Sequence, residues 1–481
     1  MRDVESSAQT RSAGRSRFLP GHGPLHCIAS SLIVAACLGC EDAAQPKDAK
    51  PVEESSFAEG FASPKACGGC HPSQYSQWRV SNHAYALTDP VFRAMNALGQ
   101  AETQGALGSF CVECHAPVAA RTGQAAVFQD PNDGTFRQDL DALDEEARHG
   151  VSCDVCHTFT KVISTGKNAH FETVPDGTRR ARIRDPIPNS FHRSEYGESF
   201  ETARMCGPCH DLISEFFSKP VRLESTFREW VVSGFNDGTT CQECHMPEAV
   251  GPASLGGPER TIHDHTMVGV DVSLLAPEAF PGFDTMRAAT IELLQRSAEL
   301  TWAWDALARD LAVQIANLAG HSLPSGSATD REMWVELTVL DVQGSVVFAS
   351  GALDARGDLK DDRPEHTLEP GADPQLVLFR QRMRFDPALE GQTGEPHDVD
   401  FLWEPNTFED NLIGAGGDLW VHYDLSSLPP GNYEVKGRLL FRTFPPYVLR
   451  KLVDRRLLDA EVLGRVPVVV MEELEQVIQV P

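Results

Sequence analysis

The chain has 481 residues, of which 41% are hydrophobic, and its formal net charge is −27 at pH 7. The apolar content excludes a wholly disordered chain, and the length predicts two packed units. The strong negative charge excludes nucleic acid and anionic membrane surfaces as natural partners. We expect a partner with a basic docking patch, although such a charge can also simply keep a protein soluble.

Residues 1–40 have the features of an export signal. Arginines precede an apolar stretch, residues 28–38, that is too short to span a bilayer. The stretch ends in small residues and cysteine, which resembles a bacterial lipoprotein box with Cys37 or Cys40 as the acylated residue. We expect an exported protein of a Gram-negative bacterium, either periplasmic or attached to the outer membrane by this lipid anchor. Ordinary signal cleavage without acylation is the alternative.

The next segment, residues 41–58, is rich in Ala, Pro, Lys, Asp and Glu. This composition is typical of a solvated, flexible linker. No other segment of the sequence is long and apolar enough to cross a membrane. The folded part is therefore expected to begin near residue 59.

Five Cys-x-x-Cys-His motifs occupy residues 59–275 and use ten of the 13 cysteines. The motif cysteines are Cys67, Cys70, Cys111, Cys114, Cys153, Cys156, Cys206, Cys209, Cys241 and Cys244, and the motif histidines are His71, His115, His157, His210 and His245. Apolar periodicity is poor in this region, whereas Gly, Pro and polar residues are common. We expect cofactors to form much of its core, with short helices packed around them. The helices are predicted over 73–87, 90–99, 198–207 and 222–234.

Beyond residue 275 the pattern becomes regular. Met286, Ala289, Leu293 and Leu300 share one face of a predicted helix over 284–303, which places a connecting helix within 276–305. Alternation with a period of two then takes over and predicts short strands. The predicted strands cover 311–315, 333–339, 346–348, 375–386, 417–424, 432–442 and 464–480. The predicted fold class is α+β, with a mostly helical and irregular domain over 59–275 and an all-β, sandwich-like domain over 306–481.

The motif spacing points to covalent haem. Two thiols three positions apart lie on one side of a helical turn, where they can add to the two vinyl groups of one haem, and the histidine that follows binds its iron. Disulfides are an alternative in an exported chain, but they do not require His after every pair. Zinc sites would join two pairs per metal, which five pairs cannot do evenly. The sequence therefore predicts five covalently bound haem c groups.

An iron that only carries electrons usually has a ligand on each face, so five further side chains are needed. Histidine is the expected donor. The spare histidines between the first motif and residue 330 are His83, His149, His170, His192, His263, His265 and His321. Seven candidates therefore compete for at most five places.

Several stretches carry a resemblance to a known family. They are residues 67–84, residues 150–157, residues 241–247, and residues 265–269, where Met267 replaces the Phe of a His-x-Phe-x-Gly pattern. Residues 317–326 look like the Gly-His-x-x-Pro-Thr-Gly element of larger members, with Ser325 in place of Thr. Together these stretches resemble the multihaem cytochromes of the c-552/c-554 family.

By that resemblance, the distal ligands are His83, His192, His265 and His321. For each of them, a surface or core histidine is the simpler alternative. The fifth place stays open between His149, which lies four residues before Cys153, the weaker candidates His170 and His263, and an iron with one open face. If His321 is a ligand, the β domain is clamped onto the haem domain.

The motifs and the resemblance favour an electron carrier that passes electrons between redox partners through mainly bis-His haems. The alternative is an enzyme, a multihaem oxidoreductase that acts on a small nitrogen or sulfur compound at one open-faced haem. Such an enzyme needs basic residues to bind an anion. Arginines that could line this site near the third motif are Arg148, Arg179, Arg180, Arg182 and Arg184, although a solvated basic loop is the commoner explanation. A third possibility is a structural or adhesive lipoprotein within a larger haem wire.

Overall fold

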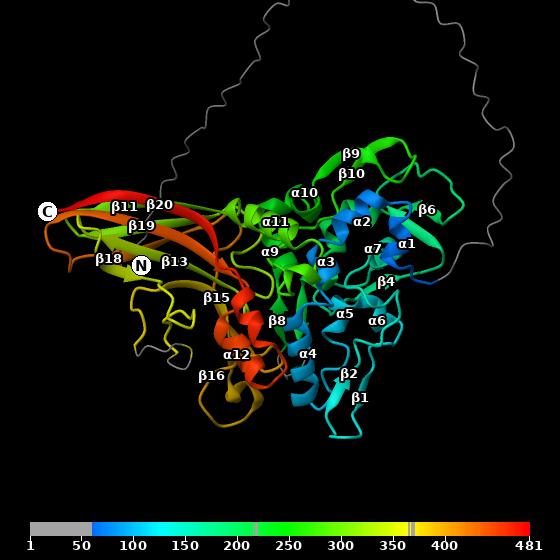
Figure 1. Cartoon of the computed structure of the whole chain (residues 1–481), viewed down its shortest axis with the longest axis horizontal. Coiled ribbons are helices and arrows are strands. Elements are labelled where there is room, and N and C mark those ends of the chain that lie inside the picture. Colours follow the sequence, from blue (N-terminus) through cyan, green and yellow to red (C-terminus); the bar gives the residue numbers. More distant parts are fainter. Residues whose placement is uncertain (1–59, 215, 217–219, 364–365, 367–370) are drawn as a thin grey trace, which may run out of the picture. The chain divides into compact units, whose positions relative to one another are not determined.

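The computed structural model describes residues 60–214, 216, 220–363, 366 and 371–481 (Figure 1). The expected signal peptide, with Cys37 and Cys40, and the expected linker over 41–58 lie outside the described residues. Helices and strands both contribute, as expected for an α+β chain. Within the described ranges, every helix is too short or too polar to span a bilayer.

Short helices carry the five motifs. The helices up to residue 245 are α1 (Pro64–Gly68), α2 (Pro72–Trp78), α3 (Asn82–Tyr85), α4 (Pro90–Glu102), α5 (Val112–His115), α6 (Pro117–Arg121), α7 (Cys153–His157), α8 (Gly207–His210), α9 (Thr226–Val232) and α10 (Cys241–His245). In the first motif the backbone N–H of His71 donates to the carbonyl of Cys67 at 2.9 Å, and the second and fourth motifs repeat this bond at 3.1 Å. This single turn brings both thiols and the imidazole to one side of the backbone.

Two-stranded sheets separate these helices, which the sequence patterns did not predict. The paired strands are β1 (Val127–Gln129) with β2 (Phe136–Gln138), β3 (Phe159–Val162) with β4 (Phe171–Thr173), β5 (Thr178–Ala181) with β6 (Arg193–Tyr196), β7 (Leu212–Ser214) with β8 (Val221–Glu224), and β9 (Glu248–Pro252) with β10 (Glu259–His263). All are antiparallel except β5 with β6, which is parallel. Each strand has only three to five residues, too short for a clear alternation of polar and apolar side chains.

The predicted helix over 284–303 is wrong in its last third. Helix α11 covers Phe283–Gln295, and strand β11 follows at Ala298–Asp305. Buried and exposed residues alternate at the start of β11, with Ala298 and Leu300 buried. The strand pairs along its whole length with β12, so a period of two had already replaced the helical period before residue 300. The β region therefore begins at β11, earlier than residue 306.

The predicted strands beyond residue 305 are confirmed. They are β12 (Asp310–Asn317), β13 (Glu332–Leu340), β14 (Val346–Ser350), β15 (Val377–Phe385), β18 (Asp418–Asp424), β19 (Gly431–Arg442) and β20 (Val469–Val480), to which the structure adds β16 (His397–Asp398) and β17 (Thr407–Asn411). One sheet has the order β11-β12-β18. The other has the order β16-β15-β13-β19-β20, with β14 beside β13 and β17 beside β15. All of these pairings are antiparallel.

The two sheets share one apolar core. Fully buried side chains from the smaller sheet, such as Leu311 and Ile315, belong to the same cluster as Met333 and Leu439 from the larger sheet. At the edge, the indole N–H of Trp302 in β11 donates to Gln476 in β20 at 2.6 Å. Burial of this extent is the main stabilising term for the β region.

Helix α12 (Pro446–Asp454), which the sequence analysis did not predict, packs against α4 of the motif region (Figure 1). Val91 and Leu98 of α4 lie in one apolar cluster with Leu449 and Leu452 of α12. The indole of Trp403 adds a hydrogen bond to Glu102 at the end of α4, at 3.1 Å. In consequence, the described residues of the motif region and the β region lie within one compact unit.

Candidate functional site

Four of the five motif histidines have a second histidine ring opposite them. The pairs are His71 with His192, His157 with His265, His210 with His83, and His245 with His321. Their ring centroids are 6.3 or 6.4 Å apart. An iron bonded at about 2 Å to one nitrogen of each ring requires ring centroids about 6 Å apart. Each pair therefore has the spacing of two axial ligands on one haem iron.

In six of these eight imidazoles, a hydrogen bond at Nδ1 leaves Nε2 free. Nδ1 of His71 lies 2.6 Å from the carbonyl oxygen of Ala253, and Nδ1 of His245 lies 2.7 Å from that of Val268. The same kind of contact occurs at His157, His192, His265 and His321. A carbonyl only accepts, so Nδ1 carries the proton and the lone pair of Nε2 is available to a metal.

Burial keeps two of the predicted distal histidines neutral. It lowers the pKa of His83 to about 4, with a further contribution from the charges of His210 and His245. Burial is also the main cause that lowers the pKa of His265 to about 4. Neutral imidazole is the form that binds a metal, so both groups are in the ligating state at pH 7.

The loop that carries His321 is tied to the motif region through α9. Glu229 accepts hydrogen bonds from the backbone N–H of Ser322 at 3.0 Å and from the hydroxyl of Ser325 at 2.7 Å. On the other side, the amide of Asn317 donates to the carbonyl of His321 at 2.8 Å. These bonds set the position of the ring opposite His245.

The second motif differs from the other four. The ring of His115 stacks on Phe92, with centroids 4.1 Å apart and planes 5° apart, while its Nδ1 lies 3.2 Å from the carbonyl of Ala86. Stacking covers one face of the imidazole and leaves the in-plane lone pair of Nε2 free. Among the described residues, no ring contact joins His115 to another histidine. The second motif thus offers one imidazole where each of the others has two.

Among the described residues, no ring contact joins His149 to His115. The ring of His149 makes an edge contact with Trp78, with centroids 5.9 Å apart, and its Nε2 lies 3.8 Å from the carboxylate of Glu145. His170 and His263 also make their contacts outside the five motifs. The ring contacts of the described residues therefore supply no histidine for the fifth distal place.

The arginines near the third motif are all paired with carboxylates. The pairs are Arg148 with Glu145 at 3.5 Å, Arg179 with Asp154 at 2.7 Å, Arg180 with Glu195 at 3.2 Å, Arg182 with Glu248 at 2.8 Å, and Arg184 with Glu201 at 2.6 Å. Their charges are therefore compensated within the chain. This geometry favours the interpretation as a solvated, ion-paired loop over an anion site.

Sulfur contacts order the motifs in space. In three pairs of motif cysteines, one thiol lies close enough to shift the pKa of the other: Cys67 with Cys153, Cys114 with Cys209, and Cys206 with Cys241. Cys156 is close enough to Cys209 for their charges to interact. In a c-type haem protein these atoms are thioethers, so the contacts mark haem edges that lie near one another. The first motif adjoins the third, and the fourth adjoins the second, third and fifth.

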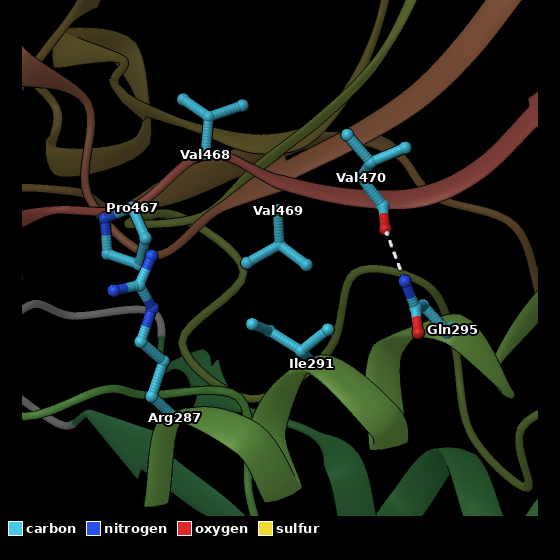
Figure 2. A pocket seen from close by; sticks show the side chains of 7 residues that line it. All are labelled: Arg287, Ile291, Gln295, Pro467, Val468, Val469 and Val470. Carbon is cyan, nitrogen blue, oxygen red and sulfur yellow. Dashed lines mark hydrogen bonds between the residues drawn. The ribbon is translucent and has the colours of Figure 1, made fainter. Parts of the chain in front are cut away.

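A small pocket between α11 and β20 is unrelated to the motifs (Figure 2). Ile291 and the valines of β20 form much of its lining, and the amide of Gln295 donates to the carbonyl of Val470 at 3.4 Å. Arg287 supplies its one charged group. The pocket has no cysteine or histidine, so it is not a candidate for the redox site.

Two contacts of the histidine rings were not predicted from the sequence. Phe92 stacks on His115, and Met267 lies with its sulfur 2.9 Å from Nδ1 of His83. For Met267 a signal was present, because it stands where the family pattern has Phe. No feature of the sequence pointed to Phe92, because its contact with His115 is formed only by tertiary packing.

Comparisons with known proteins agree with the geometry. A family model described as cytochrome c554 and c-prime matches residues 66–158. The crystal structure of a penta-heme cytochrome c552 from Thermochromatium tepidum is similar over 87% of this chain and 99% of that chain, with a TM-score of 0.58 and 22% sequence identity. At that identity the likeness concerns the fold. No curated protein matches the sequence.

Proposed function

Because the chain is a multihaem c-type cytochrome of the c-552/c-554 family, we propose that it is an exported carrier that transfers electrons between redox partners through five covalently bound haems. The observation that carries this proposal is the set of four His–His pairs with centroids 6.3 or 6.4 Å apart. Haem, when bound, supplies a one-electron redox couple. An imidazole on each face leaves no position for a substrate, which favours electron transfer without bond making.

In this proposal each side chain has one role. The ten motif cysteines attach the haems, and the five motif histidines are the proximal ligands. The distal ligands are His192 for the first haem, His265 for the third, His83 for the fourth and His321 for the fifth. The count of five haems rests on the five motifs. Carbonyl bonds to Nδ1 orient the rings and hold the proton away from the metal-binding nitrogen.

The unpaired His115 supports a second candidate function. A haem held by His115 alone would keep one face open, and an open face can bind a small molecule. The chain would then be a multihaem oxidoreductase that acts on a small nitrogen or sulfur compound at its second haem. The four paired sites would still deliver or remove the electrons.

The remaining parts of the proposal concern the partners and the location of the protein. The net charge of −27 favours redox partners with a basic docking patch. The leader favours export to the periplasm, with a lipid anchor if Cys37 or Cys40 is acylated. We interpret the two sheets with their common core as a β-sandwich that supports the fifth haem through His321.

Carbon monoxide titration of the fully reduced holoprotein tests the ligand set. Carbon monoxide binds a ferrous haem that has an open face and leaves a bis-His haem unchanged. We expect a visible spectral change that corresponds to one haem in five. Steady-state assays with nitrite, hydroxylamine and sulfite, each with a reduced or oxidised dye, then decide between the two functions.

The outcomes are distinct. One carbon monoxide per chain without turnover supports the carrier, and the same stoichiometry with turnover supports the oxidoreductase. Binding to two or more haems would contradict the four His–His pairs as ligands. No binding at all would mean that the second haem has a distal ligand, and it would remove the enzyme hypothesis.

A further inference from the structure

An arginine-lined pocket of about 450 Å³ lies beside the fourth motif. Arg204 comes just before α8, Arg222 lies on β8 and Arg228 lies on α9, so three separate segments each contribute one guanidinium group to the pocket. Phe227 and Thr165 contribute apolar parts of the wall. The pocket thus combines cations with a partly apolar lining.

Two of these cations are uncompensated. Arg222 forms an ion pair with Asp211, the acidic residue of the lining. Within the described part of the chain, neither Arg204 nor Arg228 has a carboxylate partner. Burial lowers the pKa of Arg222, and the positive charge of Arg228 lowers it further, which places these two cations near each other.

The net charge of the chain and the ion pairs near the third motif contrast with this pocket. The chain carries a net charge of −27, and the five arginines near the third motif all have carboxylate partners within 3.5 Å. Unpaired arginines that line a pocket in such an acidic protein leave a local positive potential, which attracts anions. Arg182 and Arg184, both ion-paired, provide an internal control for this comparison.

The wall of the pocket contacts the motif helix at Gly207. A Cβ atom added to Gly207 would come within 2.6 Å of the Thr165 methyl group and 3.0 Å of the Phe227 ring. Gly207 is therefore packed against the wall of the pocket. At helical spacing, residue 207 shares a face with residue 210, so the pocket lies beside the motif.

We propose that this pocket binds a small divalent oxyanion, of the class of sulfate, thiosulfate or phosphate. The planar guanidinium groups of Arg204 and Arg228 donate paired N–H bonds to tetrahedral oxyanions. Arg204 and Arg228 are both exposed, so an anion in solution can reach both groups. The carboxylate side chain of a haem has the same chemistry and is the other possible occupant.

Isothermal titration of the holoprotein with sodium sulfate tests the proposal, with sodium chloride at matched ionic strength as the reference. We expect one saturable site with a dissociation constant on the order of 1 mM. In the double variant R204Q/R228Q the affinity should fall at least about tenfold, whereas R182Q/R184Q should bind as the natural chain does. Visible spectra confirm that each variant retains its haems.

Binding that is equal in R204Q/R228Q and the natural chain would place the anion elsewhere and overturn the proposal. If sodium chloride produced the same heat of titration as sodium sulfate, the effect would be general ionic screening. That result would also overturn the proposal. The natural chain could fail to bind sulfate while R204Q/R228Q shows a changed visible or redox spectrum. This result would identify a haem carboxylate as the occupant and would overturn the proposal. If R204Q/R228Q lost its haems, the single variant R228Q would replace it, with the same tenfold loss expected.

Discussion

At the residue scale, the second motif is set apart by a contact with an aromatic ring instead of a second imidazole. Phe92 is nearly fully buried and belongs to a cluster that includes Val112 and Ala116 beside the motif. Its parallel stacking on His115 restricts rotation of the proximal ring. Ring orientation is one of the levers by which a protein tunes haem chemistry.

We therefore expect Phe92→Ala to change one haem and to destabilise the fold. Loss of a buried phenyl ring should lower the free energy of unfolding by about 3 kcal/mol. Carbon monoxide should still bind one haem, but with an altered rate and spectrum. Phe128→Ala, at an exposed phenylalanine of β1, is the control. An unchanged carbon monoxide spectrum in Phe92→Ala would show that Phe92 only fills space.

Protonation of Asp330 makes the free energy of unfolding depend on pH. Burial raises its pKa to about 6, against a hydrogen bond from Ser327 and the charge of Arg331, which both lower it. Because the pKa is higher in the folded state, the folded protein binds more protons between about pH 4 and pH 6. The free energy of unfolding therefore falls as the pH rises through this window, by on the order of 2 kcal/mol. In denaturant titrations, the free energy of unfolding of Asp330→Asn should vary less with pH than that of the natural chain. An equal dependence in both proteins would show that Asp330 is not the titrating group.

At the scale of elements, helix α4 connects the two regions of the chain. Asp89 caps its first turn by accepting a hydrogen bond from the N–H of Val91 at 2.9 Å, and Pro90 starts the helix without a lost donor. One side of α4 carries Phe92 toward the second motif, and another packs Leu98 against α12. The position of Phe92 thus depends on a helix held by the β region.

Leu452 of α12 is fully buried in this interface. Leu452→Ala should lower the free energy of unfolding by about 3 kcal/mol, because it removes buried methyl groups and leaves a cavity. Limited proteolysis should become faster in the β region as the two regions separate more easily. Leu457→Ala, at a leucine that is 37% exposed, should have little effect. Equal proteolysis of both variants would show that α12 does not hold the regions together.

At the scale of the whole molecule, His321 joins the β region to the fifth motif. It lies between β12 and β13, and its ring centroid is 6.4 Å from that of His245. The hydrogen bonds from Ser322 and Ser325 to Glu229 secure the same loop. The β region thus completes a site whose other residues come from the motif region.

The variant His321→Ala should open the fifth iron, so that carbon monoxide binds two haems per chain instead of one. It should also make the β region more sensitive to protease, because one of its attachments is lost. His422→Ala, at an exposed histidine of β18 that pairs with Asp310, is the control. If His321→Ala still bound one carbon monoxide per chain, His321 would not be an iron ligand.

Chemistry that is local in the chain could be predicted from the sequence. Cys241 and Cys244 lie three positions apart with His245 directly after, so a single helical turn suffices to present them to one cofactor. Alternation along residues 432–442 likewise identified β19, because a strand places every second residue on the same face. Where two periods meet, as at residues 296–300, the local pattern was ambiguous and the predicted helix ran too far.

Which distant residues meet depends on tertiary packing and could not be predicted from the sequence. His83 is opposite His210 and His192 is opposite His71, pairings that no spacing in the chain encodes. The stacking of Phe92 on His115 and the compensation of Arg182 by Glu248 also depend on packing between separate segments. The same holds for Arg228, which has no carboxylate partner among the described residues. The physical reason is that covalent spacing and backbone periodicity act over a few residues, whereas ring contacts and ion pairs depend on how whole elements pack together.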